Sequence, residues 1–185
     1  EAVLNAAAYT AVDGAEAEPE LAYRVNEAGA RVLAEAAARR GIPLLHVSTD
    51  YVFDGEKGAP YVESDRVHPI SVYGASKLAG EEAVRLANPR HFIVRTAWLY
   101  GPVGKNFALS IRAAAAREPR LRVVDDQWGS PSYAPRVARS RRSSARERPR
   151  TRAVAWTLRT QAAAWTEVPH EPGADARHSA GGVDE

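Results

Sequence analysis

Two residue types are missing from the 185-residue chain, which contains no cysteine and no methionine. Without cysteine, disulfides and thiolate metal sites are excluded, which fits a protein of the reducing cytoplasm. No apolar run is long enough to cross a bilayer and no basic-then-apolar leader is present, so we expect neither membrane association nor secretion. The composition, 45% hydrophobic and 26% charged, is that of a globular domain with a real core. We assign no metal ligands.

The chain begins with Glu rather than Met, and most of the residues that follow are apolar. Val3-Leu4-Asn5-Ala6-Ala7-Ala8 has the pattern of a buried strand that is entered partway through. We therefore expect this sequence to be a fragment that lacks the natural N-terminus.

The composition changes after Ala134. Up to that residue 15 Lys and Arg face 17 Asp and Glu, whereas from Pro135 onward there are 10 Arg, no Lys and 6 acids. The second part has no helix or strand periodicity, so it reads as a nucleic-acid-binding arm, a disordered tail or out-of-frame translation of a GC-rich gene. The arm ranks last because its Arg block contains no interleaved aromatic residues, and we expect no nucleic-acid partner. The sequence predicts one unit over 1–134 and an Arg-rich tail, disordered or out of frame, over 135–185.

Short apolar segments alternate with amphipathic ones in the first part. We predict a strand at the N-terminus and others at 43–48, 91–95 and 121–124, with helices at 19–40, 72–86 and 105–117. This alternation indicates an α/β fold with a doubly wound parallel sheet. A loop over 54–70, rich in Gly, Pro, Asp and Ser, is long for a compact domain, and we expect it to be functional or disordered.

Polar residues follow each of the predicted strands. They are Tyr9-Thr10, Thr49-Asp50, Trp98 to Tyr100 and Asp125 to Gln127. Ligands of open parallel sheets bind beyond the carboxyl ends of the strands. We therefore expect all four stretches at one rim of the sheet, around a ligand.

Tyr73 and Lys77 lie four residues apart and so share one face of the predicted helix. A ketone that receives hydride must also receive a proton, and a free phenol with a pKa of about 10 is a poor acid–base group at neutral pH. A nearby ammonium favours the phenolate and lowers that pKa. A Tyr-x-x-x-Lys pair alone is common, but here Thr49 precedes it at a strand end, where its hydroxyl can bind a carbonyl oxygen.

These segments resemble the dTDP-4-dehydrorhamnose reductase family, extended short-chain dehydrogenases of dTDP-L-rhamnose synthesis. The resemblance rests on Ser48-Thr49-Asp50-Tyr51-Val52-Phe53 and Tyr73-Gly74-Ala75-Ser76-Lys77, with three further matches in the same order. Those three are residues 5–13, 95–101 and 124–131. The matches span about residues 1–134, and the form around Thr49 favours this reductase over sugar epimerases and dehydratases.

The resemblance implies that Tyr73 donates the proton to the C4 oxygen and that Lys77 lowers its pKa and binds the cofactor ribose. Thr49 would bind the carbonyl. The implied cofactor is NADPH or NADH, the implied substrate a nucleotide sugar, and a homodimer is left open.

The resemblance also implies the binding residues. Ala7, Ala8, Tyr9 and Thr10 would line the cofactor, whereas Asp50 and Trp98 would contact the sugar nucleotide. The stretch 125–131 would border the substrate pocket. For Trp98 a core position is an equal alternative.

The sequence departs from the family at one motif. No Gly-x-x-Gly-x-x-Gly occurs, so the turn that cradles a pyrophosphate at a helix N-terminus is missing. The resemblance thus implies a partial Rossmann-like sheet without the first βαβ unit, and we expect this chain to be a weakly active or inactive reductase. The alternatives are a non-enzymatic dinucleotide-binding regulatory subunit, which would need no proton donor, and a sugar-nucleotide epimerase or dehydratase.

Overall fold

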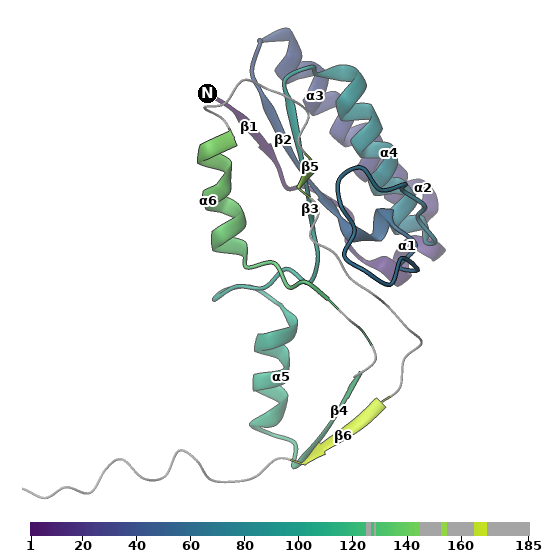
Figure 1. Cartoon of the computed structure of the whole chain (residues 1–185), viewed down its shortest axis with the longest axis vertical. Coiled ribbons are helices and arrows are strands. Elements are labelled where there is room, and N and C mark those ends of the chain that lie inside the picture. Colours follow the sequence, from purple (N-terminus) through teal and green to yellow (C-terminus); the bar gives the residue numbers. More distant parts are fainter. Residues whose placement is uncertain (125–126, 128, 145–152, 155–164, 170–185) are drawn as a thin grey trace, which may run out of the picture.

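A four-stranded parallel sheet forms the centre of the computed structural model, in the order β1-β2-β3-β5 (Figure 1). The structure describes residues 1–124, 127, 129–144, 153–154 and 165–169. The strands are β1 (Val3–Asn5), β2 (Leu44–Thr49), β3 (His91–Thr96), β4 (Arg120–Val124), β5 (Ala153–Val154) and β6 (Trp165–Pro169). This sheet with its helices confirms the predicted α/β fold class.

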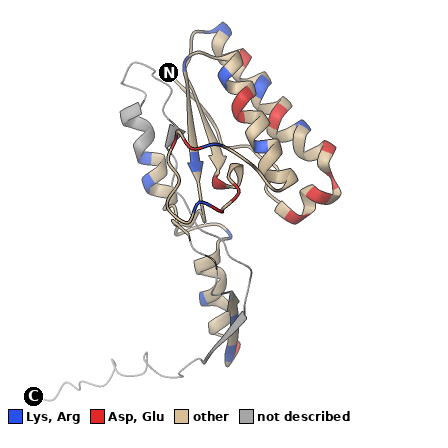
Figure 2. Ribbon diagram, turned by 45° about the vertical axis from the view of Figure 1, so that its right-hand side comes forward, with Lys and Arg blue, Asp and Glu red and all other residues tan. Residues whose placement is uncertain are grey.

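Helices lie on both sides of the sheet. The helical segments are α1 (Val12–Ala17), α2 (Pro19–Tyr23), the π-helix η1 (Arg24–Gly29), α3 (Ala30–Arg39), the 3₁₀ turn η2 (Asp50–Val52), α4 (Val72–Ala87), α5 (Phe107–Ala115) and α6 (Ala134–Ser144). Helices α1 to α4 share one side and α6 lies on the other, as both ribbon views show (Figures 1 and 2). The first helices carry much of the acidic charge visible in Figure 2.

The central strands β2 and β3 are in register from end to end. Leu44 faces His91 at one end and Thr49 faces Thr96 at the other. Both strands are largely buried, as expected for a sheet with covered faces. Because they end at the same level, the chain leaves Thr49 and Thr96 at one rim, where the predicted polar residues follow.

The helix predicted over 19–40 is three consecutive segments, and α1 before it was not predicted. The middle segment, η1, carries Asn26 inward, so that only 1% of this polar residue is exposed. Gly80 of α4 packs directly on it, because a Cβ added at Gly80 would lie 2.2 Å from the Asn26 carbonyl oxygen. The sequence pattern predicted a helix here but not its π turn, which places Asn26 against α4.

The prediction that the strand near 121–124 joins the parallel sheet is wrong. β4 pairs antiparallel with β6 in a separate two-stranded sheet that extends away from the main one (Figure 1). Its partner lies more than 40 residues downstream, and a short apolar run does not specify its neighbour. The helix predicted over 105–117 is shorter, because the Asn106 side chain caps it by accepting a hydrogen bond from the Leu109 amide at 3.1 Å.

The predicted boundary near Ala134 coincides with the first residue of α6. Beyond it the structure describes α6, β5 and β6, whereas much of the Arg block lies outside the described residues. The division into 1–134 and 135–185 stays a prediction. Among the described helices, none has the length and apolar character to cross a bilayer.

Candidate active site

The carboxyl end of β2 turns sharply at Thr49. Its hydroxyl accepts a hydrogen bond from the Tyr51 amide at 3.2 Å and donates one to Asp50 Oδ1 at 3.1 Å. The first of these bonds caps η2, which explains why the strand stops here. Thr49 itself is 6% exposed, so its hydroxyl is held just beneath the rim.

Helix α4 begins against this turn. The Ser71 hydroxyl caps it by accepting from the Gly74 amide at 3.1 Å, as predicted from the sequence. A Cβ on Gly74 would lie 2.2 Å from the Tyr51 carbonyl oxygen, so only glycine allows the helix to approach so closely. This approach places the Tyr73 ring edge-to-face with that of Tyr51, with centroids 5.5 Å apart.

Tyr73 is nearly buried, and burial raises the pKa of its phenol above the usual value. A hydrogen bond with the Thr49 side chain works in the opposite direction, and the charge of Asp50 adds to the increase. The structure does not bear out the expectation that Lys77 lowers the pKa of Tyr73. The Lys77 ammonium donates to the Val47 carbonyl oxygen at 2.8 Å, and its charge is not among the influences on Tyr73.

Lys77 is 2% exposed, and this burial lowers its pKa to about 8, although Glu81 pulls it the other way. Glu81 follows one turn later on α4 and is fully buried. Its carboxylate accepts from Arg95 Nε at 2.8 Å and from Arg95 Nη2 at 2.6 Å. One turn beyond Lys77, helix α4 therefore carries a buried ion pair between Glu81 and Arg95.

The segment after β1 holds the four residues predicted to line a cofactor. Asn26 clamps this segment, because its side chain accepts from the Tyr9 amide at 2.8 Å and donates to the Tyr9 carbonyl at 3.1 Å. The same amide group donates to the Ser76 hydroxyl of α4 at 2.9 Å. Ala7 and Thr10 are exposed, whereas Ala8 and Tyr9 are half-buried and the Tyr9 phenol is bound to Glu18 at 2.9 Å.

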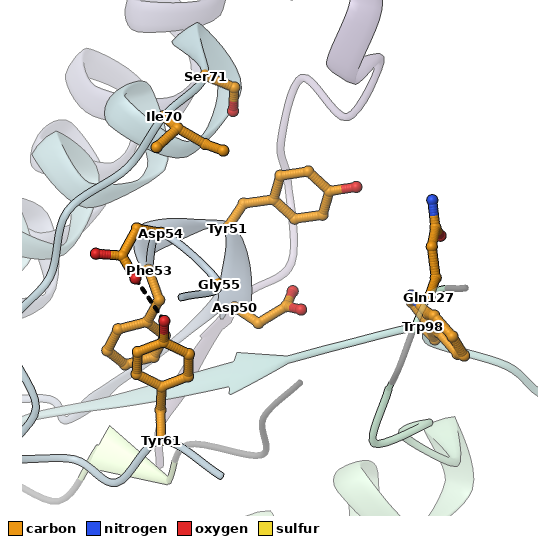
Figure 3. Close-up of a pocket in the computed structure, with 10 residues that line it drawn as sticks. All are labelled: Asp50, Tyr51, Phe53, Asp54, Gly55, Tyr61, Ile70, Ser71, Trp98 and Gln127. Carbon is orange, nitrogen blue, oxygen red and sulfur yellow. Dashed lines mark hydrogen bonds between the residues drawn. The ribbon is translucent and has the colours of Figure 1, made fainter. Parts of the chain in front are cut away.

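A cavity of about 290 Å³ opens beside the end of β2 (Figure 3). Its walls are Asp50, Tyr51, Phe53, Asp54, Gly55, Tyr61, Ile70, Ser71, Trp98 and Gln127. Trp98 and Gln127 stand together across the cavity from Asp50 and Tyr51 (Figure 3). Burial raises the pKa of Asp50 to about 6, against hydrogen bonds that lower it.

Trp98 lies on the cavity wall and is 45% exposed, so it is not a core aromatic residue. Its φ of 42° is in the left-handed region, where a bulky side chain is strained. Such strain is often found at binding sites, because the surrounding fold has to maintain it.

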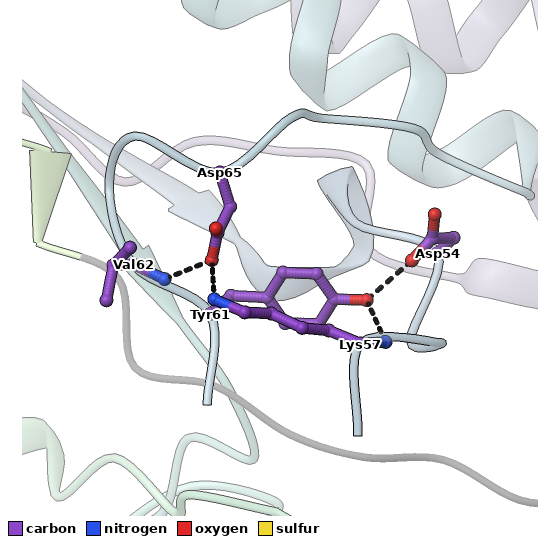
Figure 4. Close-up of polar contacts among 5 residues, drawn as sticks. All are labelled: Asp54, Lys57, Tyr61, Val62 and Asp65. Atoms are coloured by element: carbon purple, nitrogen blue, oxygen red, sulfur yellow. Dashed lines mark hydrogen bonds and ion pairs between the residues drawn. The ribbon is translucent and has the colours of Figure 1, made fainter. Parts of the chain in front are cut away.

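The loop over 54–70, expected to be functional or disordered, is ordered and forms one wall of the cavity. Tyr61 stacks on Phe53 with ring centroids 4.3 Å apart, and its hydroxyl donates to Asp54 at 2.5 Å. Lys57 reaches across the Tyr61 ring to Asp65, at 2.5 Å (Figure 4). These contacts give the loop a small core of its own.

The structure thus brings Thr49, Asp50 and Tyr73 together at the end of β2, whereas the buried Lys77 binds Val47, two residues earlier in that strand. Of the residues predicted for substrate, Asp50 and Trp98 line the cavity, whereas Thr49 does not. Asp125, Asp126 and Trp128 of the predicted pocket border lie outside the described residues. Gln127 of that stretch does line the cavity, although β4 is not part of the parallel sheet.

The sequence reasoning missed Asn26 and the Glu81–Arg95 pair. A signal for Glu81 was present, because Tyr73, Lys77 and Glu81 are spaced four residues apart and so share one helix face. An acid on a face that turns inward needs a buried cation. Asn26 carried no comparable signal, since its role depends on η1.

Comparison with known proteins places the chain in a family. The model for the RmlD substrate binding domain matches residues 1–167. This chain belongs to that family. The dTDP-4-dehydrorhamnose reductase of Sinorhizobium fredii is 54% identical over 132 residues, covering 71% of this chain and 45% of its own length. The Mycobacterium tuberculosis (strain CDC 1551 / Oshkosh) enzyme of the same name is also 54% identical, over 136 residues, with the same coverage.

A solved structure of a family member agrees with this assignment. The dTDP-4-dehydrorhamnose reductase of Bacillus anthracis, in complex with NADP, superposes with a TM-score of 0.78 at 41% identity. The match covers 83% of this chain and 55% of that protein. The chain therefore spans about half the length of the relatives that it matches.

Proposed function

We propose that the chain carries the catalytic centre of an NAD(P)H-dependent reductase that converts the C4 ketone of dTDP-4-dehydro-L-rhamnose to dTDP-L-rhamnose. The observation that carries this proposal is the buried Tyr73 hydroxyl next to the Thr49 hydroxyl, at the rim that also holds the cavity. The names of the relatives support the choice of substrate.

The residues of the site suit proton donation. Burial keeps the pKa of Tyr73 above its usual value, so the phenol is protonated at neutral pH and has a proton to give, but it is a weaker acid than a phenol in water. As hydride adds to the carbonyl carbon, the C=O electron pair moves to oxygen, which takes the Tyr73 proton and becomes the hydroxyl. Thr49 would hold that oxygen by exchanging its bond to Asp50 for one to the substrate.

The nicotinamide cofactor supplies the hydride when bound. The small, exposed side chains of Ala7 and Thr10 after β1 are suited to its nicotinamide and ribose, and Lys77 would bind the ribose by exchanging its bond to Val47. Asp50, Trp98 and Gln127 would contact the sugar nucleotide in the cavity. A glycine-rich turn for the pyrophosphate does not occur in the printed sequence, so we propose that a polypeptide of this sequence is weakly active or inactive.

A chimera tests the proposal: the parts of the S. fredii reductase that this chain does not cover are joined to it, and Tyr73→Phe is introduced. We expect NADPH-dependent reduction of the 4-keto sugar by the chimera, and a loss of kcat of about 10²- to 10⁴-fold in the variant, because the proton donor is gone. The matched control is Tyr23→Phe, since Tyr23 lies on α2 and is exposed. Equal turnover by the chimera with Tyr73 and with Phe at that position would refute the assignment of the proton donor.

A further inference from the structure

Glu81 is a fully buried acid whose oxygens are both bound by cations. Arg95 of β3 donates to Oε1 at 2.8 Å and to Oε2 at 2.6 Å, a two-point contact that fixes the carboxylate plane. Arg85, on the next turn of α4, donates to Oε2 at 2.8 Å and reaches the surface. Burying such a group is costly, and hydrophobic residues of the same volume often stabilise a protein equally well. Stability alone therefore gives a weak account of Glu81.

Glu81 links helix α4, which carries Tyr73 and Lys77, to the wall of the cavity. It sits on the same face of α4 as Tyr73 and Lys77, and its partner Arg95 comes from β3. The Arg95 guanidinium lies 5.0 Å above the Phe53 ring, and Phe53 and its stacking partner in the 54–70 loop belong to the cavity wall. One ion pair thus holds α4, β3 and the wall of the cavity in a fixed relation.

Within the part of the chain that the structure describes, few other groups stabilise the charge of Lys77. One of the three N–H groups of the Lys77 ammonium donates to the Val47 carbonyl oxygen. His46 of β2 is near enough for their charges to interact, but burial keeps this imidazole neutral at neutral pH. Arg95 and Arg85 are cations that share the single negative charge of Glu81. Among the described residues, the carboxylate of Glu81 is thus the negative group that favours the ammonium of Lys77.

We propose that Glu81, fixed by Arg95, is a positioning residue that keeps the ammonium of Lys77 charged, one turn along the same face of α4 and behind Tyr73. The role of Lys77 itself rests on the proposed function, but the electrostatic link between Glu81 and Lys77 does not. Without this link, a lysine buried to this extent loses its proton readily and cannot serve as a cation.

The chain offers a direct measurement, because it contains three lysines: Lys57, Lys77 and Lys105. Labelling the lysine side chains with carbon-13 gives one set of resonances for each, and Lys57→Arg and Lys105→Arg assign Lys77 by elimination. We expect Glu81→Gln to lower the pKa of Lys77 by about one unit or more. A general loosening of the fold would instead expose the ammonium and raise its pKa toward the ordinary value.

Glu82→Gln is the matched control, because Glu82 is the next residue on α4 and is exposed. In that variant the pKa of Lys77 stays as in the parent chain. If Glu81→Gln does not fold, Glu81→Asp tests the proposal instead. The shorter side chain cannot keep both Arg95 bonds and its distance to Lys77, so we again expect the pKa of Lys77 to fall. An unchanged or raised pKa in the folded variant overturns the proposal. The measurement needs neither substrate nor cofactor, so a failed reductase assay leaves it intact.

Discussion

His46 is a residue whose ionisation is strongly altered by the fold. It is 1% exposed, and burial lowers its pKa to about 4, with the charge of Lys77 acting in the same direction. Its Nδ1 accepts from the Asn5 side-chain amide at 3.0 Å, so the proton of the neutral ring is on Nε2. Between pH 6.5 and about 4, His46 is therefore neutral in the folded chain, whereas the same imidazole is protonated in the unfolded chain.

From this we predict an acid-sensitive contribution of His46 to stability. It is fully present above pH 6.5 and is lost as the pH falls toward about 4, by up to about 3 kcal/mol. Asp50, whose pKa is raised to about 6, has the opposite pH dependence, because its contribution to the free energy of unfolding declines as the pH rises from 3.8 to 6. Urea unfolding of His46→Gln against the parent chain, above pH 6.5 and near pH 5, isolates the His46 part.

The control for this comparison is Leu86→Gln, since Leu86 is exposed and neither side chain titrates. The parent chain should lose more stability on acidification than His46→Gln, whereas Leu86→Gln should follow the parent. Parallel losses in all three proteins would contradict a buried neutral imidazole at position 46.

At the scale of elements, the contact between α4 and η1 positions the site. Gly80 lets the two backbones approach, and Asn26 of η1 uses that proximity to bind both the segment after β1 and α4. The proposed cofactor side and the Tyr–Lys side are therefore held by one helix contact.

We predict that Gly80→Ala destabilises the chain by about 1–3 kcal/mol, although Ala is the better helix former. The reason is that the new Cβ would meet the Asn26 backbone at 2.2 Å, which no side-chain rotation relieves. Gly29→Ala is the control, because its Cβ would have only an ordinary contact of 3.8 Å with the Arg24 carbonyl oxygen. Chemical denaturation of both variants measures the difference, and equal stability would show that α4 and η1 are less closely packed.

At the scale of the whole molecule, the printed sequence contains no Gly-x-x-Gly-x-x-Gly segment beside the proposed Tyr–Lys centre. We predict weak NADPH binding, without saturation in the micromolar range, because no glycine-rich turn is available for the pyrophosphate. Calorimetric titration of the 185-residue chain measures this, with the B. anthracis reductase, solved with NADP, as the positive control. Micromolar affinity in the chain would show that the turn is dispensable.

Local patterns in the sequence determined much of this protein. The strands around 44–49 and 91–96, the Ser71 cap and the shared face of Tyr73 and Lys77 follow from periodicity, capping and helix geometry, which act over a few residues. The family likeness came from the same short segments, and the match to residues 1–167 confirms it.

The tertiary structure alone decided the rest. The antiparallel partner of β4, the inward turn of Asn26, the contact of Lys77 with Val47 and the raised pKa of Tyr73 depend on groups distant in sequence. Burial and charge neighbours set a pKa, and these exist only once the chain is packed. The sequence thus identified the chemical groups at the rim of the sheet, and packing determined how each of them is charged and held.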